Sequence, residues 1–175
     1  MTNTRKLVIL SFLTALTIIL ARFLSIQIQV LRIGFEFLPI LVAAVLFGPI
    51  AGGIVGAVAD IIGATLFPAG TFFPGFTISA FTTGIIYGLF FYKKQLTWSK
   101  AIFGTLVKIV VVDMLMVSAW LIILYGMPVA ALLPTRLLKF AVMLPVETAM
   151  VYFGLKPLLS RINKTTGILV PSSAK

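Results

Sequence analysis

The sequence predicts an all-α integral membrane protein, a bundle of six transmembrane helices with both termini on the cytoplasmic side. Two observations predict this class. Of the 175 residues, 61% are hydrophobic and only 10% are charged, and a water-soluble domain of this length cannot bury so much apolar surface. The apolar residues also fall into six runs, separated by short polar stretches or by proline and glycine. We therefore expect one transmembrane domain over residues 1–164 and a short polar tail over residues 165–175.

The six runs are expected to form the helices. The first is about 18 residues long, which is enough to cross the hydrocarbon core. The Ile-Gln-Ile-Gln alternation after it favours an extended or interfacial loop. Gly48-Pro49 predicts a tight break with proline starting the next helix, the prolines and glycines of 67–75 predict a loop, and the stretch after Pro157 is expected to be loose. The expected spans are Leu7–Leu24, Phe35–Phe47, Pro49–Leu66, Phe76–Tyr92, Trp98–Tyr125 and Ala131–Leu155.

The basic residues predict the orientation. Nine of the 14 fall on one side of the membrane if both termini are cytoplasmic, as the positive-inside rule requires, and an even number of spans agrees. Because they flank apolar runs, they indicate topology and not a nucleic-acid surface. The nine are Arg5, Lys6, Lys93, Lys94, Lys100, Lys156, Arg161, Lys164 and Lys175.

Missing residue types exclude several functions. The chain has no Cys and no His, so it offers no disulfide, thiol nucleophile or imidazole ligand, and we expect no metal and no cofactor. The absence of a paired-carboxylate motif as well argues against a membrane enzyme. No Gly-x-x-x-x-Gly-Lys-Ser/Thr loop is present, so the chain does not hydrolyse ATP by that route. Without an obvious repeat of two inverted halves, transport by this chain is expected to need other chains.

Charged residues within the membrane mark the candidate site. A charge at the centre of a bilayer helix costs about 2.5–3.5 kcal/mol, so it is retained where a partner or a ligand offsets that cost. The expected topology lets six such residues converge on one outward-facing cavity. Their excess of cations favours a ligand with carboxylates, although the two cations that begin the sixth span could instead reach the outer headgroups. The six are Arg22, Arg32, Asp60, Asp113, Arg136 and Lys139.

Two further charges are expected to hold the bundle together. Lys108 and Glu147 fall in the inner halves of their spans at similar depth, and we interpret them as a structural ion pair and not as ligand contacts. The sixth span carries its charges on one face at the helical period, so this face should point into the bundle. The face comprises Arg136, Lys139, Met143 and Glu147.

Small residues predict close helix contacts. Glycines recur every four residues along the third span and end in Asp60, which predicts a packing seam. Asp60 itself is expected either to pair with Arg22 or Arg32 or to accept hydrogen bonds from a ligand. On the first span, Ser11 and Ala15 are four residues apart, a spacing that suits contact with another helix.

Hydroxyl and aromatic residues complete the candidate pocket. Ser79 and Thr83 share a face of the fourth span and would line the pocket, unless their hydroxyls bond only their own backbone. Phe72 and Phe73 lie in the Pro/Gly loop, where they would either stack on a planar ring as a lid or anchor the loop at the membrane interface.

Several motifs carry a resemblance to a known family. The chain resembles the substrate-binding S components of energy-coupling-factor (ECF) vitamin transporters in Arg32-Ile-Gly-Phe-Glu-Phe-Leu-Pro39, Phe47-Gly-Pro49 and Gly56-x-x-x-Asp60. It is similar to the folate-specific branch in the loop from Asp60 to Thr77, in Arg136-Leu-Leu-Lys139 and in Pro145-Val-Glu147. The resemblance extends from Arg5 to Arg161.

This resemblance implies a six-helix bundle that binds one vitamin in its outer half. It also implies assembly with a membrane-coupling T subunit and two cytoplasmic ATPases, with delivery by reorientation in the membrane. Family members tend to carry Ala-x-x-x-Ala on the first helix for docking to the T subunit, and this chain has Ser11-x-x-x-Ala15. Folate would place its glutamate tail on the cations and its pterin against the aromatic, acidic or hydroxyl residues. The alternatives are an S component for another vitamin and a stand-alone carrier or channel.

Overall fold

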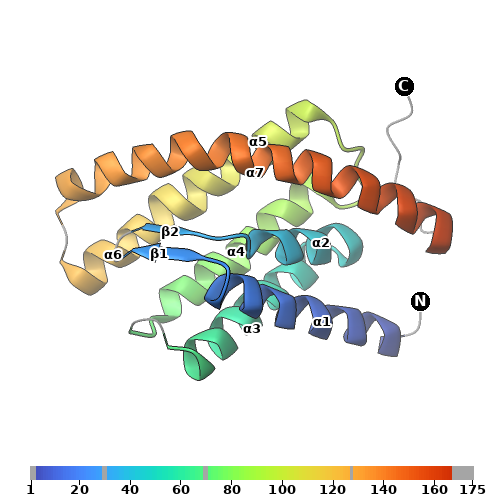
Figure 1. The fold of residues 1–175 in the computed structure, drawn as a ribbon, viewed down its shortest axis with the longest axis horizontal. Helices are drawn as coiled ribbons and strands as arrows, with labels where there is room; N and C mark the ends of the chain where they lie inside the picture. The colour runs from blue at the N-terminus through green and yellow to red at the C-terminus, as the bar shows by residue number, and fades with distance from the viewer. Residues whose placement is uncertain (1–2, 29–30, 69–70, 127, 167–175) are drawn as a thin grey trace.

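A computed structural model describes residues 3–28, 31–68, 71–126 and 128–166 (Figure 1). In this part of the chain, five helical segments are long and apolar enough to cross a membrane, and α2 is a shorter apolar helix. The expected all-helical membrane protein with six helices is confirmed, counting α5, η1 and α6 as one continuous helical segment, and five of the six are of membrane length. The elements are α1 (Asn3–Arg22), β1 (Ile26–Ile28), β2 (Leu31–Ile33), α2 (Phe37–Phe47), α3 (Pro49–Leu66), α4 (Pro74–Phe91), α5 (Trp98–Lys108), η1 (Ile109–Met116), α6 (Val117–Tyr125) and α7 (Val129–Thr166).

The helices pack in two groups that share α4. In the first group, α3 packs extensively on α4, and α1 and α2 both pack on α3. In the second, α5 and η1 pack on α7, and α4 joins the groups by contacting α5, η1 and α6. α7 runs along one long side of the molecule and α1 along the other, and α1 begins at the same end at which α7 finishes (Figure 1). The first three residues of the Ile-Gln alternation form β1, which pairs antiparallel with β2.

Glycine lets the helices of the first group approach closely. A Cβ on Gly84 of α4 would overlap the backbone of Gly52 of α3, and a Cβ on Gly56 would lie 2.5 Å from the carbonyl oxygen of Ala80. The turn between α2 and α3 also needs glycine, because Gly48 has a φ of +98°. The glycine seam expected on the third span is therefore a packing surface against α2 and α4.

The fifth span is not a regular α-helix. Residues Ile109–Met116 form the π-helix η1 between α5 and α6, where the sequence predicted uninterrupted helix. A π-helix closes its hydrogen bonds from residue i to i+5 and is often found at functional sites. It changes which residues of this span share a face.

Several boundaries differ from the predicted ones. α1 begins at Asn3 and ends at Arg22. α4 begins two residues earlier than predicted, at Pro74, because proline suits the first turn of a helix, where its missing N–H is not needed. The loose tail predicted after Pro157 is wrong for residues 158–166, since α7 continues through Pro157 to Thr166. Residues 167–175 of that tail lie outside the described residues.

Candidate binding cavity

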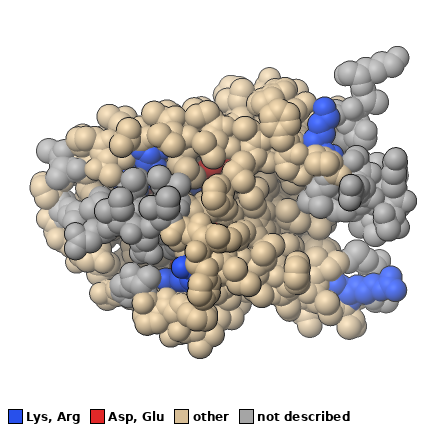
Figure 2. Space-filling model, viewed as in Figure 1, with Lys and Arg blue, Asp and Glu red and all other residues tan. Residues whose placement is uncertain are grey.

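A cavity of about 270 Å³ lies inside the bundle, near the lower end of the range for small-molecule pockets. Side chains of α1 to α4 line it, and so do side chains of η1, α6 and α7. All four acidic residues of the chain contribute to its wall, together with four basic residues among those whose side chains the structure describes. On the face shown in Figure 2, most of the described surface is uncharged. The charged lining residues are Arg22, Glu36, Asp60, Lys108, Asp113, Arg136, Lys139 and Glu147.

Four of these charges form a continuous row across the second helix group. Lys139 Nζ lies 2.8 Å from Asp113 Oδ1, and Asp113 Oδ2 lies 2.9 Å from Lys108 Nζ. Lys108 also donates to Glu147 Oε1 at 2.7 Å, and Tyr87 donates its hydroxyl to the other oxygen of Glu147 at 3.4 Å. The predicted structural ion pair between Lys108 and Glu147 is confirmed. It is also part of the cavity wall.

The π-helix explains the inner contact of this row. Lys108 and Asp113 are five residues apart, which at the α-helical period places side chains about 140° apart around the axis. η1 begins directly after Lys108, and the i to i+5 bonds of a π-helix widen its turn, so residues five apart lie closer together around the axis than on an α-helix. Asp113 can therefore face Lys108 and the cavity together.

Arg136 differs from the other cavity charges of α7. It is 4% exposed, and its Nε and Nη2 atoms have no hydrogen-bond partner among the described residues. Lys139, one turn later, is engaged with Asp113. The predicted inward face of the sixth span is confirmed by the burial of Met143 and Glu147. Because buried donors without an acceptor are costly, Arg136 offers hydrogen bonds to a ligand acceptor.

The wall formed by α3 and α4 is held by hydroxyl contacts. Thr77 Oγ1 donates to Asp60 Oδ2 at 2.8 Å. Trp120 Nε1 donates to Ser79 Oγ at 3.0 Å, which ties α6 to α4. Thr83 bonds the backbone carbonyl of Ser79, as the alternative for these hydroxyls predicted, and it lines the cavity as well.

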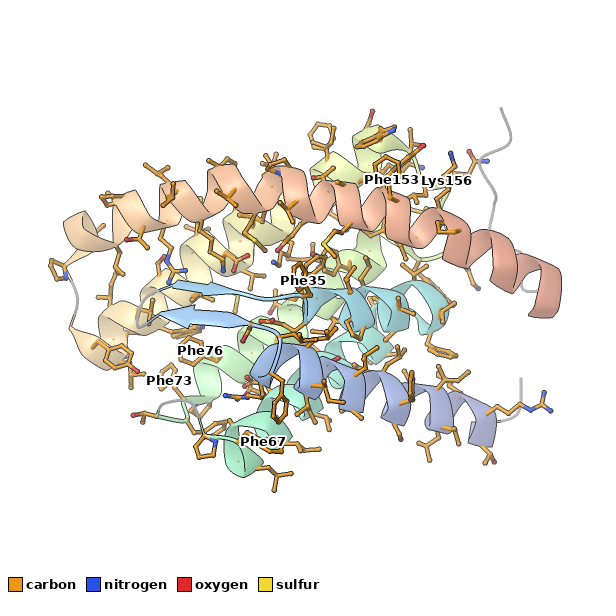
Figure 3. All side chains as sticks on the ribbon, in the orientation of Figure 1. Phe35, Phe67, Phe73, Phe76, Phe153 and Lys156 are labelled. Carbon is orange, nitrogen blue, oxygen red and sulfur yellow. The ribbon has the colours of Figure 1, made fainter. Side chains whose placement is uncertain are left out.

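Aromatic rings cover the part of the cavity near the loop before α4. The Phe73 ring centroid lies 5.6 Å from that of Trp120 and 6.0 Å from that of Phe76. Phe73 and Phe76 lie together at the start of α4, at the opposite end of the molecule from Phe153 and Lys156 (Figure 3). Phe72 also lines the cavity but is 46% exposed. An exposed ring beside a clustered pair suits a cover for a flat ligand.

The structure brings together nine of the ten residues predicted to bind a ligand. The tenth, Arg32, lies on β2 opposite Gln27, and its side chain is outside the described residues. Ser11 and Ala15 are exposed on α1. Contact of any of these residues with a ligand or a subunit stays a prediction. The nine are Arg22, Asp60, Phe72, Phe73, Ser79, Thr83, Asp113, Arg136 and Lys139.

The predicted excess of cations stays a prediction, because the side chain of Arg32 lies outside the described residues. Among the described side chains, the cavity wall has four basic and four acidic residues, since Glu36 and the pair Lys108–Glu147 also line it. The contacts of Thr77 and Trp120 were not predicted, because their partners are 17 and 41 residues away in the chain. Glu36 lies within a motif quoted above, and that motif was the signal available for it.

Comparisons with known proteins show which proteins this chain is similar to. The family model for the S component of ECF-type riboflavin transporters matches residues 1–151. The chain is 41% identical over 152 residues to the folate transporter FolT of Clostridium novyi (strain NT), covering 87% of this chain and 88% of that protein. It is 30% identical over 157 residues to the folate transporter FolT of Leuconostoc mesenteroides, with 86% and 84% covered.

Two solved structures resemble the fold. A crystal structure of FolT bound with folic acid matches with a TM-score of 0.83 and 36% identity, over 86% of this chain and 94% of that one. The structure of the S component of a bacterial ECF transporter matches with a TM-score of 0.69 and 25% identity, over 93% and 99% of the two chains.

Proposed function

The chain belongs to the family of substrate-binding S components of ECF-type transporters, and on this premise we propose that it binds folate as the capturing subunit of a vitamin importer. It is a multi-pass membrane protein that binds its ligand and is not an enzyme. The single observation that carries the choice of folate is the similarity, over most of both chains, to a FolT structure that contains folic acid. Both curated relatives are folate transporters as well.

The chemistry of the cavity supports an anionic ligand with a flat ring. Folate carries a glutamate tail with two carboxylates, and the unpartnered donors of Arg136 lie one turn from Lys139 to receive them. The pterin has a planar, hydrogen-bonding face, for which Phe72 and Phe73 supply rings. Asp60 and Ser79 supply polar atoms on the same wall.

Riboflavin is the second candidate, because the matching family model is that of riboflavin transporter S components. Riboflavin also has a flat ring system, but it has no carboxylate to receive the donors of Arg136. The two candidates therefore predict different roles for one side chain. Replacing Arg136 by Ala should weaken folate binding and leave riboflavin binding, if any occurs, nearly unchanged.

Transport in this proposal requires a T subunit and two ATPases, with both termini in the cytoplasm. Basic side chains gather over aromatic rings at the end where α1 begins and α7 finishes: Lys6 over Phe47, Lys93 over Tyr92 and Lys156 over Tyr152. Lysine and aromatic residues together suit the cytoplasmic membrane interface. This distribution supports the orientation.

The exposed pair Ser11 and Ala15 on α1 is the proposed docking surface for the T subunit. We expect Ala15→Leu to leave folate binding unchanged and to abolish uptake, because a bulky side chain would keep the helices apart. Uptake is measured in liposomes that contain the complete transporter, with Thr65→Leu on the exposed side of α3 as control. Normal uptake by the Ala15 variant would remove this face from the proposal.

Titration of the purified chain with folate in detergent tests the function. Trp120 bonds Ser79 and contacts Phe73 at the cavity, whereas Trp98 stacks on Tyr152 at 4.2 Å near the start of α5. Folate should therefore quench mainly Trp120, and the quenching should survive Trp98→Phe but fall in Trp120→Phe. Calorimetry measures the affinity for folate independently of tryptophan fluorescence.

Saturable folate binding with no riboflavin binding supports the proposal. Binding of riboflavin without binding of folate would support the second candidate function, a riboflavin-binding S component. A folded protein that binds neither vitamin by calorimetry contradicts both. Uptake by the purified chain alone, without ATPases, would indicate a stand-alone carrier.

A further inference from the structure

Asp113 is the cavity acid that most directly opposes an anionic ligand. We propose that Asp113 is an internal counter-ion: it holds Lys139 before the ligand binds and gives it up to a ligand carboxylate, so that it limits affinity and favours ligands with more than one carboxylate. This proposal rests on the proposed function, because it needs an anionic ligand.

The charge balance of the cavity motivates this exchange. Among the side chains that the structure describes, the four bases and four acids that line it balance, so a ligand with two carboxylates brings negative charge that they do not offset. Arg136 can meet one carboxylate with donors that have no partner among the described residues. A second carboxylate needs a cation that already has a partner.

Lys139 is the cation placed to supply it. It lies three residues after Arg136 on α7, which puts both side chains on one face. Among the acids that the structure describes, Asp113 is the one that pairs with Lys139. Lys108 is less available, since it lies between Asp113 and Glu147 and is 7% exposed. Arg22 lies on another wall, where its Nε is 3.1 Å from the position of a Cβ on Gly63.

Asp113 can release Lys139 without losing all its cations. Its second oxygen lies 2.9 Å from Lys108, a contact that the π-helix provides. A buried carboxylate without any cationic partner would cost free energy, whereas Asp113 would keep Lys108 as its partner. The row of charges therefore permits an exchange of partners at its outer end while its inner end, Lys108 with Glu147, stays in place.

The test is the affinity of Asp113→Asn for folate and for unsubstituted pterin, measured by calorimetry. The amide cannot compete for Lys139 as a carboxylate does, so folate should bind at least about fivefold more tightly, the lower end of ordinary coupling between charged groups. Pterin has no carboxylate, and its affinity should not change. The unliganded variant should unfold at a lower temperature, and folate should raise that temperature by more than in the wild type.

Asp60→Asn is the matched control. This substitution also turns a cavity carboxylate into an amide. The partner of Asp60, however, is the Thr77 hydroxyl, whereas the partner of Asp113 is a lysine. Asp60→Asn should not tighten folate binding. Equal tightening in both variants would mean that net charge alone acts, and would contradict a specific exchange at Asp113.

The remaining outcomes separate this inference from the proposed function. If the wild type does not bind folate, the proposed function fails. If the wild type binds folate and folded Asp113→Asn binds it equally or more weakly, the exchange is wrong. Should Asp113→Asn not fold, Lys139→Gln decides: folate affinity should fall at least about fivefold with pterin affinity unchanged, and wild-type affinity for folate would overturn the exchange.

Discussion

Two interfaces of this protein are held together by opposite means. Between α3 and α4, glycine brings backbones into contact, with Gly84 against Gly52 and Gly56 against Ala80. Between the fifth span and α7, charged side chains bridge the helices, Asp113 of η1 to Lys139 and Lys108 of α5 to Glu147. The first interface cannot open or shift without losing its packing. The second can exchange partners while its helices stay in place.

This difference assigns separate tasks to the two interfaces. Membrane helices associate through packing and hydrogen bonds, because lipid provides no hydrophobic force between them. Glycine contacts supply a rigid wall for the cavity, on which Asp60 and Ser79 are fixed by Thr77 and Trp120. The charged interface keeps cations beside the cavity for a ligand to use. Variants at each interface can test whether rigidity and charge are separated in this way.

The largest effect on stability is expected at the inner end of the charged interface, at Lys108 and Glu147. Lys108→Met removes the cation shared by Asp113 and Glu147, and breaking a buried ion pair costs about 3–5 kcal/mol. Thermal unfolding in detergent should show a large loss of stability. Lys94→Met is the control, because Lys94 is exposed and bonds only the Leu89 carbonyl in the described structure. Equal stability of the two variants would contradict a structural role for the inner pair.

Reversal of the same pair sharpens this result. Lys108→Glu with Glu147→Lys should recover part of the stability lost in either single variant. Full recovery is not expected, because Lys108→Glu would place a carboxylate beside Asp113, which now lies 2.9 Å from Lys108. Full recovery would mean that Asp113 is not coupled to the inner pair.

A smaller effect is expected at the glycine interface. Gly84→Leu would drive a side chain into the backbone of Gly52, and overpacking costs about 1–3 kcal/mol. Gly154→Leu is the matched control, since a Cβ there meets nothing within 4 Å and leucine favours helix. Thermal unfolding should separate the two variants. If Gly84→Leu is as stable as Gly154→Leu, α3 and α4 are not in close contact.

The glycine interface was predictable from sequence, and the charged one only in part. Small residues every four positions repeat at the helical period, so the seam on α3 is visible in one segment of chain. The pairing of Lys108 with Glu147 followed from depth alone. The contact of Lys108 with Asp113 did not, because five-residue spacing separates side chains on an α-helix and the π-helix has no clear sequence signal.

The end of α7 shows the same limit. Proline and a polar composition after residue 155 predicted a loose tail, yet the helix continues through Pro157 to Thr166. Proline removes one backbone hydrogen bond, and a long helix can tolerate that loss. Six cavity charges were predicted from their cost in the membrane, but the sequence did not show that Glu36, Lys108 and Glu147 also line the cavity.

The smallest effect is expected where a polar contact supports the glycine interface. Thr77→Val keeps the shape of the side chain and removes the hydroxyl that donates to Asp60, a loss of about 1 kcal/mol. Thr82→Val is the control, because the Thr82 hydroxyl bonds its own helix at the Ile78 carbonyl. If α3 and α4 are fixed by glycine packing, Thr77→Val should lower the unfolding temperature slightly and change folate affinity only through Asp60. A loss of stability as large as that of Gly84→Leu would show that the hydrogen bond, and not backbone contact, joins these helices.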